Sequence, residues 1–298
     1  MPPINHDPAA ARAAISSIRA LDLRRASIEE ILDLLTPVFR GYRVQAPHFQ
    51  PGITLFRSRI CDKPSHISGL LSPPSHITPV GRVNRAGNPI LYCCTSRQAP
   101  FFESRPAEGQ TVAIGRWVTT APLLANHVGY TQSAFNALQS NRQHAGWGPE
   151  PVMHLNEAVS DFLAETFTTI VPRGSEYRYK LSVAIAEKLF IDDLFDGLLY
   201  PTTAMSANAD NFALKLRYAN EHMHFQRAEY ARIEHVRDFA FDITLLDTAT
   251  QLGSDGCICW KGRLDQWVLN EPGAQLTLTA ENGEWVARDI HGSIVQAE

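Results

Sequence analysis

Residues 81–103 read GRVNRAGNPILYCCTSRQAPFFE, and this stretch predicts a strand that carries polar groups suited to binding a nucleotide. Gly87 and Asn88 are typical of a tight turn, and the apolar run at 89–94 that follows them indicates a buried strand. Tyr92 lies within this run, so we expect it on a rigid element. The chain around it is therefore the natural place to look for a site.

The residues after this strand predict a short helix. Thr95 or Ser96 can cap its N-terminus, and Pro100 is acceptable in a helix only within the first turn. Such a helix would carry Glu103 back over the cleft that the strand borders. A carboxylate would then face the same space as the tyrosine.

A second strand is predicted upstream at residues 55–60, LFRSRI, where apolar and polar side chains alternate. Alternation places Arg57 and Arg59 on one face of this strand and Ser58 on the other. Arg57 is the candidate for binding an anion, and Arg59 is the alternative on the same face.

Several blocks of the chain, taken in order, resemble the RES-domain family, whose toxin members consume NAD on a fold similar to that of the ADP-ribosyltransferases. Tyr92 follows Arg82 by ten positions and Glu103 follows Tyr92 by eleven, which is similar to the family's arginine, tyrosine and glutamate set. The match covers roughly residues 51–217, and its strength lies in the order and spacing of its motifs. The other matching blocks are Phe56-Arg57-Ser58-Arg59, Gly81-Arg82-Val83-Asn84, Tyr179-Lys180-Leu181-Ser182, DGLLYPT at 196–202 and Asn211-Phe212-Ala213-Leu214.

The resemblance implies an α+β fold with an ADP-ribosyltransferase-like mixed sheet. Outside the matched region, the sequence pattern adds flanking N-terminal helices and a C-terminal antiparallel β extension. It implies NAD as the substrate, cleavage of the nicotinamide–ribose bond by hydrolysis or phosphorolysis, and no metal or further cofactor. Depletion of NAD would inhibit growth, so a neutralising protein partner, an antitoxin or inhibitor, is expected. The oligomeric state stays open, with a homo-oligomer as one option.

The chemistry of this cleavage explains the residue types. Its transition state resembles an oxocarbenium ion, which calls for a carboxylate near the ribose, and the resemblance assigns this role to Glu103. Arg82, with Arg57 in support, suits the pyrophosphate because a guanidinium presents a planar fork of donors. The ring of Tyr92 can stack on the cationic nicotinamide, and Asn84 can add a neutral hydrogen bond.

One position departs from the family pattern. The family carries a serine after its Tyr-Pro pair, whereas this chain has Thr202. The hydroxyl is kept but the added methyl crowds the site, so Ser206, four residues on, is the alternative. Either hydroxyl would hold the carboxamide of NAD or orient Glu103.

Two other functions stay open. Transfer of ADP-ribose to a macromolecule would place the acceptor near Glu103 and near a polar loop predicted at 124–151, where Trp147 is a candidate to stack on adenine. A module that binds without turnover is the second, and the change to Thr202 favours it. Without the resemblance, Arg82 and Glu103 would be interpreted as surface charges or a modest ion pair.

Composition narrows the class of protein without naming a reaction. A formal charge of −4 and 19% charged residues give no basic surface, so nucleic acid is not an expected partner. No apolar run has the length of a membrane span, and the N-terminal residues 1–7 lack the basic and apolar regions of a signal peptide. We therefore expect a cytoplasmic protein without a membrane partner.

The cysteines do not form a framework. Their odd number, five, and the lack of a regularly spaced set suit a reducing compartment. Cys257 and Cys259 with His222 and His224 do not have the spacing of a structural zinc motif, so we interpret the two cysteines as alternating strand residues.

The remaining chain predicts the domain organisation, with residues 1–50 as an N-terminal helical segment, 51–228 as a RES-like catalytic core and 229–298 as a β-rich extension. In the first segment, helices are predicted at 9–21 and after the capping box at Ser27, ending near Pro37 and Gly41. In the core, helices are predicted at 156–170 and 182–190.

Alternation in the last seventy residues predicts short antiparallel strands at 239–245, 266–269, 275–279 and 284–287. Asn282 and Gly283 are typical of a two-residue hairpin turn. This β unit can extend the core sheet, form an accessory domain or bind an inhibitor, and the pattern does not choose among them.

Overall fold

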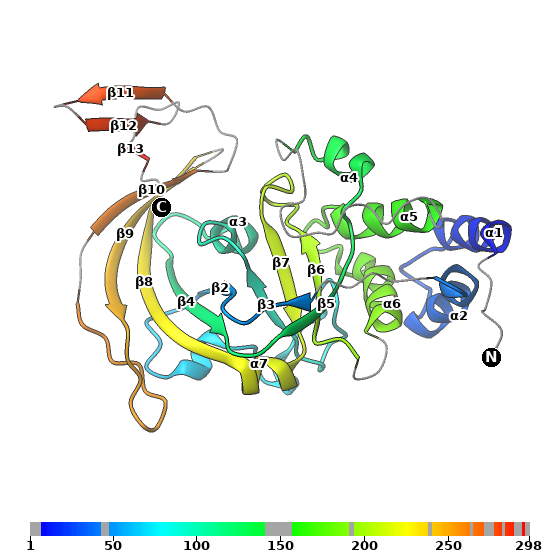
Figure 1. Cartoon of the computed structure of the whole chain (residues 1–298), viewed down its shortest axis with the longest axis horizontal. Helices are drawn as coiled ribbons and strands as arrows, with labels where there is room; N and C mark the ends of the chain where they lie inside the picture. The colour runs from blue at the N-terminus through cyan, green and yellow to red at the C-terminus, as the bar shows by residue number, and fades with distance from the viewer. Residues whose placement is uncertain are drawn as a thin grey trace. The chain divides into compact units, whose positions relative to one another are not determined.

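The computed structural model describes residues 7–42, 48–140, 157–190, 194–237, 240–262, 265–270, 277–281, 284–288 and 294–295, and it shows an α+β chain (Figure 1). The chain forms two compact units, each built from three separate segments. Unit 1 comprises residues 1–51, 72–92 and 121–222, and unit 2 comprises residues 52–71, 93–120 and 223–298. The predicted α+β class is confirmed.

Unit 1 contains most of the helices. Two helices from the N-terminal segment, α1 and α2, pack on each other and on α5 and α6, as the blue and green ribbons in Figure 1 show. Its elements are α1 (Pro8–Arg19), α2 (Ile28–Phe39), β1 (His48–Phe49), η2 (Ser75–Ile77), β5 (Leu123–His127), α4 (Gln132–Ala137), α5 (Glu157–Thr168), η3 (Glu176–Arg178), α6 (Tyr179–Leu189), β6 (Gly197–Pro201), β7 (Asp210–Leu214) and α7 (Leu216–His222).

The N-terminal helices form where local capping predicts them. The Asp7 carboxylate accepts hydrogen bonds from two main-chain amides of the first turn of α1, and the Ser27 hydroxyl accepts one from the amide of Glu30 at the start of α2. The prediction that this helix ends near Pro37 and Gly41 is confirmed, because its last residue, Phe39, lies between them. A proline in the last turn removes one hydrogen bond to the preceding turn, and the buried face of α2 outweighs that loss.

The sheet of unit 1 has the order β1-β5-β6-β7. β5 and β6 pair in parallel, with Asn126 opposite Leu198, whereas β1–β5 and β6–β7 are antiparallel. The sheet is therefore mixed, as predicted. The predicted loop at 124–151 is wrong in its first part, which contains β5 and α4, while Trp147 lies outside the described residues.

A continuous apolar core joins the helices of unit 1 to this sheet. Ile31 and Leu35 of α2, Phe167 of α5 and Ile185 of α6 are fully buried in it. Val83 belongs to the same core, so the segment that carries Arg82 is anchored by packing. Burial of each large aliphatic side chain contributes roughly 1.5–3 kcal/mol, which explains why the predicted helical faces are apolar.

Unit 2 is built on an antiparallel sheet with the order β3-β2-β4-β8-β9-β10. The predicted strand at 55–60 and the predicted short helix are both present, and the boundary between the units passes through β3, after Tyr92. The elements are β2 (Thr54–Ile60), η1 (Ile67–Leu70), β3 (Leu91–Cys94), α3 (Ala99–Ser104), β4 (Thr111–Thr119), β8 (Met223–Arg237), β9 (Ala240–Ala249), β10 (Asp265–Asn270), β11 (Thr277–Glu281), β12 (Glu284–Arg288) and β13 (Ile294–Val295).

The C-terminal strands extend the sheet of unit 2. β8 pairs with β4 along its length, for example Arg232 opposite Thr111, and β9 and β10 follow it. β8 also runs without a break through residue 228, where the sequence pattern had suggested a boundary. β11, β12 and β13 form a separate three-stranded sheet, and Asn282 and Gly283 lie outside the described residues.

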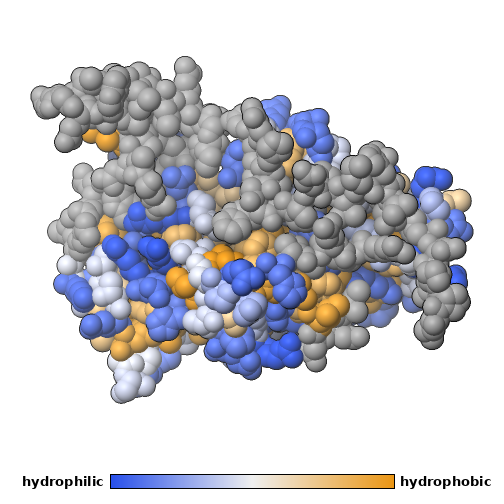
Figure 2. Space-filling view, in the orientation of Figure 1, coloured by the Kyte–Doolittle hydropathy of each residue, from blue (hydrophilic) through white to orange (hydrophobic). Residues whose placement is uncertain are grey.

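On the face drawn in Figure 2, hydrophilic and hydrophobic residues are interspersed wherever described residues are visible. Within the described part of the chain, no helix combines the length and the apolar character needed to cross a bilayer. 

Candidate functional site

The segment from Gly81 to Tyr92 is held by hydrogen bonds between its own side chains. The Tyr92 hydroxyl donates to the side-chain oxygen of Asn84 at 2.6 Å and accepts from the main-chain amide of Val83 at 3.1 Å. The Asn84 amide donates to the carbonyl oxygens of Pro79 at 2.9 Å and of Arg85 at 2.8 Å. The predicted site residues Tyr92 and Asn84 therefore meet, and they fix the loop in which Arg82 lies.

Gly81 is the glycine that this loop requires. A Cβ atom at this position would lie 2.4 Å from Oδ1 of Asn84 and 2.7 Å from the hydroxyl of Tyr92. Both distances are far below a van der Waals contact, so a side chain would displace the bonded pair. Packing therefore explains why the first residue of the Gly-Arg-x-Asn block is a glycine.

Arg82 reaches from this loop to the C-terminal end of α5. Its Nη1 atom donates to the carbonyl oxygen of Phe167 at 2.8 Å and to that of Thr169 at 3.2 Å. The last carbonyls of a helix lack intrahelical donors, so the guanidinium satisfies them. The Phe167 ring contacts the Tyr200 ring at 5.7 Å between centroids, which connects Arg82 with the predicted YPT block.

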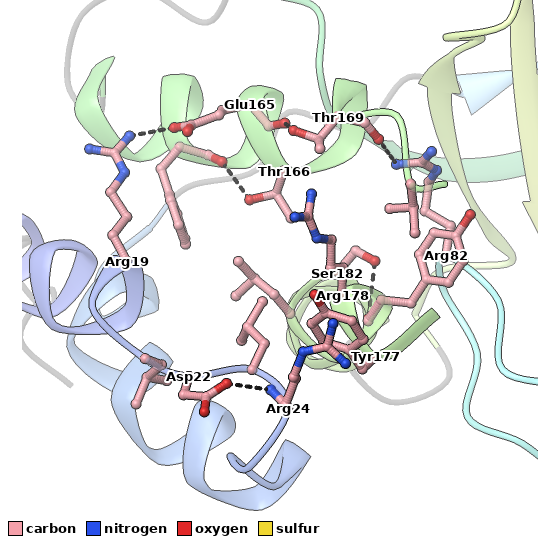
Figure 3. A pocket seen from close by; sticks show the side chains of 16 residues that line it. Arg19, Asp22, Arg24, Arg82, Glu165, Thr166, Thr169, Tyr177, Arg178 and Ser182 are labelled. Atoms are coloured by element: carbon pink, nitrogen blue, oxygen red, sulfur yellow. Dashed lines mark hydrogen bonds and ion pairs between the residues drawn. The ribbon is translucent and has the colours of Figure 1, made fainter. Parts of the chain in front are cut away.

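Arg82 also lines a pocket of about 400 Å³ that lies wholly within unit 1 (Figure 3). Four arginines line it, together with two carboxylates and several aromatic and aliphatic side chains. In Figure 3, Arg19 and its partner Glu165 lie at one side of this pocket and Arg82 lies at the other. The charged lining residues are Arg19, Arg24, Arg82, Arg178, Asp22 and Glu165.

Aromatic rings contact three of these guanidiniums. The carbon Cζ of Arg24 lies 4.1 Å from the centroid of the Tyr177 ring, and that of Arg82 lies 5.6 Å from the Tyr179 ring. The Cζ atom of Arg19 lies 6.0 Å from the Phe162 ring. Arg178 and, more weakly, Arg24 lower the pKa of the exposed Tyr177 hydroxyl by hydrogen bonding and by their charge. The pocket therefore has a positive local potential that favours anionic groups.

Glu103 lies in unit 2, near the end of the short helix α3, where its side chain is exposed. The expected caps Thr95 and Ser96 are wrong, because the cap residue is Gln98 and its side chain makes no capping bond. Instead, the Ser96 hydroxyl accepts a hydrogen bond from the Gln98 amide at 3.2 Å, just before the helix begins. Pro100 lies in the first turn, as predicted.

The hydroxyl of Ser58 on β2 joins α3 to the sheet by hydrogen bonds. The Ser58 hydroxyl donates to the carbonyl oxygen of Pro100 at 3.0 Å and contacts the hydroxyl of Ser104 at 3.4 Å. Arg59, the alternative to Arg57, donates to the carbonyl oxygen of Gly69 at 3.2 Å. Ser58 therefore positions the helix that carries Glu103, a role that the sequence pattern did not indicate.

Arg57 and Glu103 act on the same buried thiol in unit 2. Burial raises the pKa of Cys94 well above its usual value, the charge of Glu103 raises it further, and the charge of Arg57 lowers it. Burial likewise raises the pKa of Cys93 to about 12, with Arg57 again opposing. An arginine and an exposed carboxylate therefore both act on the thiol at the end of β3.

Thr202 and Ser206 lie in unit 1, in the eight-residue connection between β6 and β7. Thr202 is fully buried, and its amide and carbonyl bond main-chain atoms of Ala209 and Ala207. Ser206 is partly exposed and has a positive φ of 49°. Of the two hydroxyls, that of Ser206 is the one with access to solvent.

The seven predicted site residues thus fall into two groups, each described within its own unit. Unit 1 contains Arg82, Asn84, Tyr92, Thr202 and Ser206, and unit 2 contains Arg57 and Glu103. Sequence reasoning missed the pocket arginines at 19, 24 and 178, which come from segments interpreted as packing helices. The local signal was a single arginine between two tyrosines at 177–179.

Within the described residues, no group of three or more His, Cys, Asp or Glu side chains is arranged to hold a metal ion. No protein-family model matches the chain, and a comparison with curated proteins found no match. The assignment of a function therefore depends on the residues themselves.

Proposed function

We propose that this chain cleaves the bond between nicotinamide and ribose in NAD, on a core that resembles the ADP-ribosyltransferases, with water or phosphate as the acceptor. The observation that carries the proposal is the exposed carboxylate of Glu103 on α3, grouped with Arg57, in a chain whose arginine, tyrosine and glutamate have the spacing of the RES-domain family. 

Glu103 has the central role in this proposal. When the C–N bond breaks, its electron pair leaves with nicotinamide, whose cationic ring becomes neutral, and positive charge develops on the ribose. An adjacent carboxylate stabilises that charge. The attacking oxygen of water or phosphate then bonds the ribose carbon, and any proton it loses passes to solvent or to a base. The hydrogen bond from the Ser58 hydroxyl to the carbonyl oxygen of Pro100 fixes the position of α3, the helix that carries Glu103.

Arg82 and Arg57 supply phosphate binding. Nη1 of Arg82 bonds two carbonyl oxygens, while its Nη2 and Nε have no partner among the described residues. These two donors form the edge of a guanidinium that binds a phosphate in a forked manner. A guanidinium anchored through one nitrogen loses less conformational entropy when it binds a ligand.

Tyr92 and Asn84 take different roles. Stacking of Tyr92 on nicotinamide uses the ring, so it is compatible with a hydroxyl that is bonded to Asn84. The side chain of Asn84 uses both amide hydrogens and its oxygen within the loop, so we assign it to shaping the loop around Arg82. Ser206 is the preferred hydroxyl for the carboxamide of NAD, because Thr202 is fully buried.

The test is the rate of nicotinamide release from NAD by the purified chain, with and without phosphate. Glu103→Gln keeps the shape of the side chain and should lower the rate about 100-fold or more. Asp62→Asn is the matched control, since Asp62 is an exposed carboxylate of unit 2 and its removal should leave the rate unchanged.

The other outcomes have distinct signatures. Label from NAD that stays on a protein would identify a transferase. Absence of nicotinamide release by a folded chain would overturn the hydrolase proposal and favour a binding module. Release that is equal in the Glu103→Gln variant would contradict the assignment of this carboxylate. If the activity is present, loss of NAD in cells would inhibit growth, and a neutralising protein partner is expected.

A further inference from the structure

The arginine-lined pocket of unit 1 contains more positive charge than its own carboxylates balance. Four arginines and two carboxylates line it, and Glu165 forms an ion pair with Arg19 at 2.5 Å. Asp22 is directed to its own segment, where its carboxylate accepts from the main-chain amide of Arg24 at 3.0 Å and pairs with Arg25 at 3.6 Å. Among the described residues, Arg24, Arg82 and Arg178 have no carboxylate partner. 

Contacts within the chain preorganise these three guanidiniums. Arg82 is bonded to the end of α5, Arg24 is stacked on Tyr177, and Arg178 lies beside the hydroxyl of the same tyrosine. Three like charges around one pocket repel one another unless an anion compensates them. Planar forks of donors suit phosphate oxygens.

The rest of the lining suits an organic group. Aliphatic side chains and the ring of Phe162 also line the pocket, and the volume of about 400 Å³ falls in the range of pockets that hold small organic ligands. We propose that this pocket binds a nucleotide that carries two adjacent phosphates, with Arg24, Arg82 and Arg178 on the phosphates and the apolar side chains against the base.

This inference concerns binding alone, so it stands or falls independently of NAD cleavage. Arg24 comes from the segment after α1 and lies outside the part of the chain that resembles the RES-domain family. Arg82 is shared with the proposed reaction, and for that reason the test uses Arg24 and Arg178.

The test is isothermal titration calorimetry of the full chain with three probes, namely ADP, inorganic pyrophosphate and adenosine. ADP should bind most tightly, pyrophosphate less tightly and adenosine weakest, and added salt should weaken ADP binding. The Arg24→Ala/Arg178→Ala double variant should raise the Kd for ADP about tenfold or more, since it removes two charged donors from the phosphates.

Two controls keep the result interpretable. Arg12→Ala removes an exposed arginine of α1 that does not line the pocket, and it should leave the Kd unchanged. Arg24→Lys/Arg178→Lys keeps both charges without the forks, so its Kd should fall between those of the wild type and the alanine variant. The alanine variant should also melt as the wild type does, because both side chains are exposed.

Three results would overturn the proposal. They are no heat with ADP or pyrophosphate, equal affinity for ADP and adenosine, or ADP binding that is unchanged in the folded Arg24→Ala/Arg178→Ala variant. Nicotinamide release is not measured in this experiment, so a chain that fails to cleave NAD can still pass it.

Discussion

The hydroxyl of Tyr92 donates a 2.6 Å hydrogen bond to the side-chain oxygen of Asn84, and this bond joins two residues that the sequence had assigned separately to a nucleotide. Asn84 is buried, and its amide hydrogens are bonded to main-chain carbonyls. The pair therefore acts first on the loop that holds Arg82. The stacking of the Tyr92 ring on a ligand stays a prediction.

Tyr92→Phe should lower the free energy of unfolding by about 1–3 kcal/mol, because it removes the partner of both Asn84 and the Val83 amide while it keeps the ring. Urea unfolding followed by circular dichroism measures this change. Tyr177→Phe removes the hydroxyl of a half-buried tyrosine and serves as the control, with a much smaller change in the free energy of unfolding. Equal stability of the two variants would contradict the structural role of the bond.

Gly81→Ala should be destabilising by roughly 1–3 kcal/mol, since the new Cβ would overlap Oδ1 of Asn84 and the hydroxyl of Tyr92. The overlap depends on the hydroxyl, so the Gly81→Ala/Tyr92→Phe double variant should lose less stability than the sum of the two single changes. A double-mutant cycle in urea measures the coupling. Strict additivity would show that the clash is relieved elsewhere.

Glu229→Gln should lower the free energy of unfolding by about 3 kcal/mol, because the nearly buried carboxylate pairs with Arg97 at 2.8 Å and with Arg227 at 2.9 Å. Its loss leaves two partly buried guanidiniums without compensation. Glu234→Gln breaks the more exposed pair with Arg232 and should lower the free energy of unfolding much less. A larger loss of stability in Glu234→Gln than in Glu229→Gln would contradict the argument from burial.

The exposed thiol of Cys257 should become more reactive in the Asp255→Asn variant. The carboxylate of Asp255, which accepts a hydrogen bond from this thiol, raises the pKa of Cys257, so less thiolate is present near neutral pH. Without that negative charge the pKa falls toward its ordinary value, and alkylation at about pH 8 should accelerate. 

Peptide mass spectrometry after timed treatment with iodoacetamide measures this rate. The buried Cys93, whose pKa is raised to about 12, should stay unmodified in the folded chain and acts as an internal control. An unchanged rate at Cys257 would mean that Asp255 does not govern this thiol.

Much of the secondary structure could be predicted because its signals are local. Ser27 caps α2, alternation marks β2, and the turn formers before residue 89 precede β3. The prediction of a loop failed where context overrides a local rule, because the polar residues after 124 include a strand that pairs with two neighbours.

The candidate site could be predicted only in its residue types. The spacing of Arg82, Tyr92 and Glu103 marks three polar residues on adjoining elements, and the structure confirms that Glu103 lies on a short helix after β3. The Asn84 amide bonds a carbonyl of its own loop, and the Ser58 hydroxyl bonds a carbonyl of α3. These bonds depend on how the segments pack, so the local sequence pattern did not predict them.

The sequence by itself determined the α+β class, the alternation of the strands and the capping of the first two helices, because these depend on residues within one or two turns of each other. Only the tertiary structure decided that Arg24, Arg82 and Arg178 line one pocket. Those residues are far apart in the chain, and they meet because the apolar faces of α1, α2, α5 and α6 are buried together. Hydrophobic burial is non-directional, so the place where it brings charges together follows from packing and not from local pattern.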